Sequence, residues 1–97
     1  MTIDIKRTDE TVIALTGRLD TTTAPTLDKT IQEDIGDTKN LVLDLKKLEY
    51  ISSAGLRVIL AAQKKMQNIG TMKLTNVCEL VMEVFEMTGF ADILTIE

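Results

Sequence analysis

The sequence contains no histidine and no tryptophan, and it has one cysteine, Cys78, and one proline, Pro25. Without histidine, the serine–histidine and cysteine–histidine pairs of nucleophilic enzymes cannot form, and the commonest metal ligand is missing. A lone cysteine also excludes an internal disulfide and a zinc site built from several cysteines. We therefore expect no catalytic residues, no metal and no cofactor.

Two further shortages exclude other classes of protein. Aromatic residues make up 3% of the chain, and the formal net charge of −4 is opposite in sign to that of a nucleic-acid-binding surface. No apolar run approaches the roughly 20 residues of a membrane span, and the first residues lack the apolar region of a signal peptide. We expect no direct nucleic-acid partner, no membrane insertion and a cytoplasmic location.

The composition is otherwise that of an ordinary globular domain. Hydrophobic residues make up 44% and charged residues 27% of a chain of 97 residues. This length is enough for one hydrophobic core and too short for two. We predict a single domain over residues 1–97.

The most informative stretch runs from residue 40 to residue 70. It opens with a compact apolar run, Leu41 to Leu45, which is typical of a buried strand. Four small residues, Ser52 to Gly55, mark a turn, and apolar residues then recur every three to four positions. This spacing predicts a helix from Ser53 to about Ile69, which Gly70 ends, with two serines at its N-terminus.

Alternation of apolar and polar residues predicts the other strands. The first two, Thr2 to Lys6 and Thr11 to Leu15, are close enough in sequence to form an antiparallel hairpin, which Thr16 and Gly17 end. A further strand is predicted at Thr71 to Asn76. A strand, helix and strand of these lengths imply a right-handed parallel crossover.

Two more helices follow from capping signals and periodicity. One is predicted from about Ala24 to Ile35, with threonine and Pro25 at its start and Gly36 at its end. The other is predicted from Val77 to about Thr88, capped by Asn76, with an apolar side that includes Leu80 and Met87. The whole pattern predicts an α/β fold with a mixed β-sheet and about three α-helices.

The two serines at the start of the central helix have chemistry of their own. The first backbone N–H groups of a helix have no internal partner, so a serine oxygen there can cap them. A phosphoryl group on such an oxygen would also be well placed, since helix N-termini bind anions. Spacing alone leaves both interpretations of Ser52 and Ser53 open, with a simple N-cap the commoner of the two.

The string LEYISSAGLRVIL resembles the signature of STAS domains, specifically the stand-alone anti-sigma factor antagonists of bacteria. The resemblance extends to the segment around Asp20 and to VFEMTGFADILTI near the C-terminus, so it covers nearly the whole chain. In the family a helix and a glycine in this last stretch lead to a final strand, here Ile93 to Ile96, so the resemblance implies a mixed β-sheet of about five strands with about three α-helices. In that family a serine in an Asp-Ser-(Ser/Thr/Ala)-Gly-Leu setting is phosphorylated by a kinase that is itself the anti-sigma factor. The resemblance places this phosphoacceptor on Ser53, and the usual preceding Asp falls on Ser52, where the chain departs from the pattern.

The resemblance also implies neighbours for Ser53. Asp20 would be an acidic neighbour of that serine; the alternative is that it caps the next helix or lies solvated in its loop. Arg57 would either pair with an acidic group on the partner or simply lie exposed to solvent on the helix face. The partner-binding residues expected from the resemblance and the exposed helix face are Asp20, Thr21, Thr22, Thr23, Ser52, Ser53, Ala54, Gly55, Arg57 and Lys64.

The function implied by the resemblance is a regulatory switch without catalysis of its own. The unphosphorylated protein would bind an anti-sigma factor serine/threonine kinase and so release a sigma factor for transcription. Phosphorylation at Ser53 would break that contact, and a serine phosphatase would restore it. The alternative is a constitutive accessory or scaffold subunit of a membrane lipid transporter or signalling complex. An enzyme is the least favoured class, because no carboxylate pair or nucleophile–base pair has suitable spacing.

Overall fold

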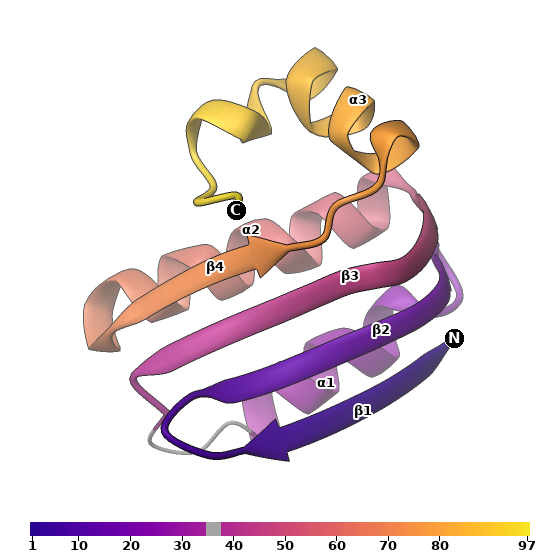
Figure 1. Cartoon of the computed structure of the whole chain (residues 1–97). Helices are drawn as coiled ribbons and strands as arrows, with labels where there is room; N and C mark the ends of the chain where they lie inside the picture. The colour runs from indigo at the N-terminus through magenta and orange to yellow at the C-terminus, as the bar shows by residue number, and fades with distance from the viewer. Residues whose placement is uncertain (35–37) are drawn as a thin grey trace.

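The computed structural model describes residues 1–34 and 38–97, and within them the chain forms a four-stranded sheet with helices packed around it (Figure 1). The elements are β1 (Thr2–Arg7), β2 (Thr11–Leu19), α1 (Ala24–Asp34), β3 (Asn40–Ile51), α2 (Ser53–Ile69), β4 (Thr71–Thr75), α3 (Glu79–Thr88) and a 3-10 turn, η1 (Phe90–Asp92). The strand order is β1-β2-β3-β4. β1 runs antiparallel to β2, and the other neighbours are parallel. The predicted mixed α/β fold is therefore confirmed.

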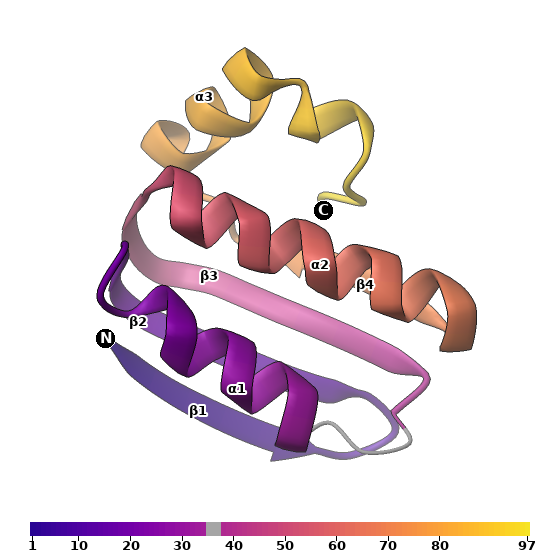
Figure 2. The same cartoon turned by 180° about the vertical axis from the view of Figure 1, so that it is seen from behind.

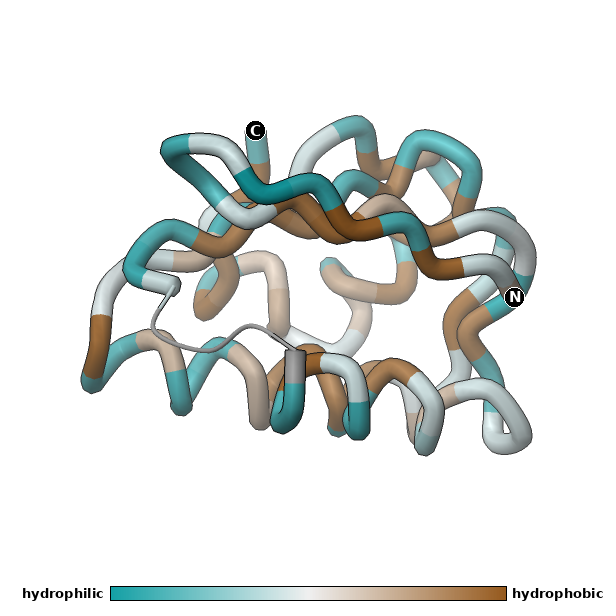
Figure 3. Tube along the Cα trace, turned by 90° about the horizontal axis from the view of Figure 1, so that it is seen from below, coloured by the Kyte–Doolittle hydropathy of each residue, from teal (hydrophilic) through white to brown (hydrophobic). Residues whose placement is uncertain are grey.

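The hydrophobic core lies between the sheet and the two helices α1 and α2, which cover the same face of the sheet (Figure 2). One row of side chains crosses all four strands, because Ile5, Ile13, Leu43 and Leu74 are successive partners in the strand register. The last three are fully buried. Seen from below, hydrophobic and hydrophilic residues alternate along β1, as a strand with one covered face requires (Figure 3).

Most of the predicted elements are present with similar bounds. The hairpin of β1 and β2 is antiparallel as expected, and α2 runs from Ser53 to Ile69. Helix α1 begins at Ala24, with Pro25 in its first turn. The predicted end of that helix, Ile35 and Gly36, lies outside the described residues.

Two strands are longer than the sequence indicated. β2 continues through Gly17 to Leu19, because Gly17 adopts a positive φ of 103° at an irregularity in the pairing with β3 instead of ending the strand. β3 continues to Ile51, beyond the predicted end at Leu45. The exposed lysines after Leu45 interrupt the apolar pattern at a second shift in register, but the strand does not end there.

The predicted start of the last helix is wrong. Helix α3 begins at Glu79, and Asn76 does not cap it. Asn76 adopts a left-handed φ of 56°, and its side-chain amide donates a hydrogen bond to Asp44 Oδ1 at 3.1 Å. Leu80 and Met87, which the periodicity assigned to the buried side, are exposed; Val81 and Phe85 are the buried residues of α3.

The predicted C-terminal strand is reduced to a single parallel bridge between Leu74 and Ile96. Residues 90–92 first form η1, so the chain reaches β4 only at its last residues, where Leu74 N donates to Thr95 O and Glu97 N donates to Leu74 O. The sheet therefore has four strands and one added bridge. Within the described residues, none of the helices has the length and apolar character that spanning a membrane requires.

Candidate functional site

The candidate site lies where the ends of β2 and β3 meet the start of α2. Leu19 and Ile51, the last residues of the two strands, are partners in the register. The next backbone N–H, that of Ser52, donates to Leu19 O at 2.9 Å. This bond holds the turn into α2 beside the loop that follows β2, so residues about thirty positions apart in the chain share one corner of the molecule.

Gly55 allows the first turn of α2 to lie against this corner. It is buried, and a Cβ atom on it would lie 2.7 Å from Leu19 Cγ and 2.9 Å from Ile51 Cγ1. Both distances are shorter than carbon atoms tolerate, so a larger residue would push α2 away from the sheet. Gly55 was predicted as a partner contact, but its burial indicates that it positions the helix.

The two serines have different surroundings. Ser52 is the N-cap of α2: its backbone is extended, and its Oγ accepts a long hydrogen bond of 3.4 Å from Gly55 N. Ser53 is the first residue of α2, and it is exposed. The first turn contains no acidic residue. The structure therefore assigns the capping role to one hydroxyl and leaves the other at the surface, beside the positive end of the helix dipole.

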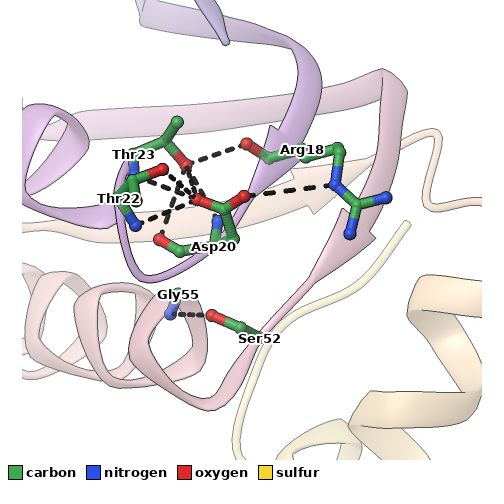
Figure 4. A network of polar contacts seen from close by, with 6 residues as sticks. All are labelled: Arg18, Asp20, Thr22, Thr23, Ser52 and Gly55. Atoms are coloured by element: carbon green, nitrogen blue, oxygen red, sulfur yellow. Dashed lines mark hydrogen bonds and ion pairs between the residues drawn. The ribbon is translucent and has the colours of Figure 1, made fainter.

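Asp20 organises the loop that leads into α1, and this loop lies beside the first turn of α2 (Figure 4). Asp20 Oδ1 accepts hydrogen bonds from the Thr22 hydroxyl at 2.8 Å, from Thr22 N at 3.0 Å and from Thr23 N at 3.1 Å. The Thr23 hydroxyl in turn donates to Arg18 O and accepts from Asp20 N. Asp20 thus holds its own loop together and lies at the same corner as the two serines.

These hydrogen bonds change the acidity of Asp20. The pKa of the Asp20 carboxyl lies below its ordinary value, chiefly because the Thr22 hydroxyl donates a hydrogen bond to the carboxylate. The backbone N–H groups of Thr23 and Thr22 and the Thr23 hydroxyl lower the pKa further, whereas partial burial raises it. Asp20 is therefore ionised at neutral pH. It supplies a fixed negative charge at the corner.

Arg18 belongs to the same corner and was not found from the sequence. Its guanidinium lies 4.3 Å from the centre of the Tyr50 ring, and its Nε lies 4.0 Å from Asp20 Oδ2. Arg18 and Tyr50 are register partners on neighbouring parallel strands. The only sequence signal would have been that register, which the two irregularities in the β2–β3 pairing conceal.

The other predicted partner-binding residues divide into two groups. Thr21, Thr22 and Arg57 are exposed near the corner, whereas Thr23 and Ala54 are half-buried there. Lys64 is exposed, but it lies eleven residues after Ser53, about 16 Å further along the helix axis. The structure thus brings nine of the ten predicted residues together around the start of α2 and places Lys64 on a more distant part of the same helix.

Comparison with known proteins agrees with this fold. The model of the STAS domain family matches residues 2–97. The chain belongs to the STAS domain family. BtrV of Bordetella bronchiseptica is 46% identical over 63 residues, which are 64% of this STAS domain and 53% of BtrV, about half its length. The anti-sigma-B factor antagonist of Bacillus subtilis is 28% identical over 96 residues, covering 97% of this chain and 88% of the relative.

Solved structures show the same fold. An anti-sigma factor antagonist from Mycobacterium paratuberculosis is 24% identical to this STAS domain, with a TM-score of 0.89 over 98% of this chain and 83% of that one. SpoIIAA in its unphosphorylated form has a TM-score of 0.77 at 18% identity, over 99% of this chain and 87% of that one. The phosphorylated form of SpoIIAA, from Bacillus, also has a TM-score of 0.77, at 19% identity over 99% and 91% of the two chains.

We predict that Gly55→Ala destabilises the domain by about 1 kcal/mol or more, because the added methyl group must displace Leu19 and Ile51, and overpacking of this kind outweighs the better helix propensity of alanine. Urea unfolding followed by circular dichroism measures the change. Gln67→Ala, at an exposed position of the same helix, is the control and should leave stability nearly unchanged. A Gly55→Ala protein as stable as the wild type would show that the corner is not tightly packed.

The lowered pKa of Asp20 predicts a pH dependence of stability. Because the folded-state pKa lies below the unfolded-state value, near 3.9, the carboxylate stabilises the fold above that pH and loses this contribution as the pH falls through the folded-state pKa. The difference in unfolding free energy between wild type and Asp20→Asn should therefore be constant from about pH 5 to 7 and shrink below about pH 4. Asp9→Asn, in the exposed turn between β1 and β2, controls for the loss of one negative charge. A difference that stays constant to pH 3 would contradict the assignment.

Proposed function

We propose that this STAS domain is an anti-sigma factor antagonist whose binding to an anti-sigma factor serine/threonine kinase is controlled by phosphorylation at Ser53. The observation that carries the proposal is the division between the two serines. Ser52 caps α2, while Ser53 is exposed at the first position of the helix. The family membership and the names of the relatives support the same role.

The cycle has two states. In the unphosphorylated state the domain occupies the kinase and a sigma factor is released for transcription. The kinase then transfers phosphate: Ser53 Oγ bonds to the γ-phosphorus of ATP, the bond to the β-phosphate oxygen breaks, ADP leaves and a base of the kinase takes the hydroxyl proton. A serine phosphatase hydrolyses the phosphoserine and restores the first state. All of these partners act in the cytoplasm.

A surface effect is enough to operate this switch. A phosphoryl group adds a charge of about −1.5 to −2 at neutral pH, which a water-excluding interface accepts only opposite cations. A penalty of about 3 kcal/mol weakens binding roughly a hundredfold. The equal TM-scores to the two forms of SpoIIAA support a mechanism in which the fold stays the same. Because Ser53 is exposed, a phosphoryl group on its hydroxyl can lie at the surface of α2.

The proposed contact surface is the corner described above together with the outer face of α2. Arg57 and Lys64 are exposed on that helix, and both are basic. An acidic partner surface would complement them. Asp20 keeps the neighbouring loop, with Thr21 and Thr22, in a fixed conformation.

A scaffold role is the second candidate, and Ser52 favours it, because the negative charge that usually precedes the phosphoacceptor in the family is missing here. A structure of a sulfate transporter family protein from Wolinella succinogenes shares the fold, with a TM-score of 0.75 at 18% identity. In such a role the same surface would bind a partner without phosphate turnover. Genes beside the one for this chain separate the two candidates, since a kinase or phosphatase gene supports the switch and transporter genes support the scaffold.

We predict that Ser53→Asp weakens binding to the anti-sigma factor kinase of the same organism by at least tenfold, because it places a permanent negative charge in the interface. Isothermal titration calorimetry with the purified kinase and ADP measures the affinity. Asn68→Asp, which adds the same charge at an exposed position near the other end of α2, should bind like the wild type. Equal binding by Ser53→Asp and the wild type would overturn the switch and favour the scaffold.

A further inference from the structure

The charged residues of helix α2 are all basic. Its 17 residues include Arg57, Lys64 and Lys65 and no aspartate or glutamate, and its first turn contains no acidic residue. Helix α3, by contrast, begins with Glu79. Carboxylates are favourable at a helix N-terminus because they offset the positive end of the helix dipole. The N-terminus of α2 therefore lacks the compensating charge that α3 has within its own first turn.

The nearest cation on the helix follows Ser53 by four residues. Side chains at positions i and i+4 lie on the same face of a helix, about 5–6 Å apart at Cβ, so Ser53 and Arg57 are neighbours at the surface. Both are exposed. The ion pairs among residues 1–34 and 38–97 join Arg18 to Asp20 and Lys73 to Glu10 and Glu97, and none of them involves Arg57.

We propose that Arg57 is the intramolecular ion-pair partner of a phosphoryl group on Ser53. The inference rests on the proposed phosphorylation of Ser53 and adds which side chain of this domain pairs with the phosphoryl group. A guanidinium donates two parallel N–H groups to phosphate oxygens, and such charge-assisted bonds are among the strongest in proteins. The pair forms within one helical turn, so it requires only a side-chain rotation and no change in the fold.

This pair gives Arg57 a different role in each state. Without phosphate, the guanidinium is at the surface and is available to a carboxylate of the partner. With phosphate, it turns to its own helix. The partner then meets a new anion and also loses a cation, so one modification weakens the interface in two ways. Lys64, about 16 Å along the axis, keeps its charge in both states.

The test uses protein with phosphoserine incorporated at position 53 during translation, so that no kinase is needed. A pH titration followed by ³¹P NMR measures the second pKa of the phosphate in the wild type and in the variants Arg57→Ala, Arg57→Lys and Lys64→Ala. A cation beside the phosphate stabilises the dianion and lowers this pKa. We expect Arg57→Ala to raise it by about 0.2–0.4 units, the size that a helical i,i+4 ion pair produces. Arg57→Lys should restore most of the difference, and Lys64→Ala should leave the pKa within about 0.1 unit of the wild type.

Equal shifts in Arg57→Ala and Lys64→Ala would overturn the proposal, because they would reflect only the net charge of the helix. No shift in either variant would overturn it as well. Circular dichroism of each protein checks that α2 is intact, which we expect because both side chains are exposed. Since phosphoserine is installed without a kinase, either negative result leaves the control of partner binding by Ser53 unaffected. Conversely, a chain that its kinase never phosphorylates would refute the proposed function even if Arg57 binds the installed phosphate.

Discussion

The contact of Gly55 with Leu19 and Ile51 is the constraint on which the candidate site depends. It sets how closely the first turn of α2 approaches the ends of β2 and β3. The backbone bond from Ser52 N to Leu19 O fixes the same approach from the side of the turn. Because this corner is packed, the hydroxyl of Ser53 has a defined place at the surface, and the loop of Asp20 lies next to it.

The electrostatics of this corner depend on which charges are fixed and which are not. Asp20 is held by the hydroxyl and N–H groups of its own loop and is also near Arg18, so its charge serves mainly to keep the loop in place. Ser52 is neutral and is used as a cap. The first turn of α2 thus has no acidic side chain of its own to offset the positive end of the helix dipole, which favours a negative group added there.

The sequence predicted the parts of the fold whose signals are local. Helix α2 was found with both bounds because its apolar period, its small N-terminal residues and Gly70 agree. The lengths of β2 and β3 were missed because Gly17 and the lysines after Leu45 look like chain breaks, whereas the pairing of the two strands absorbs them as irregularities in register. Asn76 was misassigned because its side chain bonds to Asp44 on another strand. Of the site, the serines and Asp20 were foreseen, but the stacking of Arg18 on Tyr50 depends on a register that only the folded sheet shows.

The central claim is that the two adjacent serines have separate roles, one structural and one regulatory. Mass spectrometry of the intact protein purified from its own host, with fragmentation to locate any modification, tests this claim most directly. Wild type and Ser52→Ala should carry a phosphoryl group on residue 53 that varies with growth and stress conditions, and Ser53→Ala should carry none. A phosphoryl group on Ser52, or none in any condition, would contradict the account.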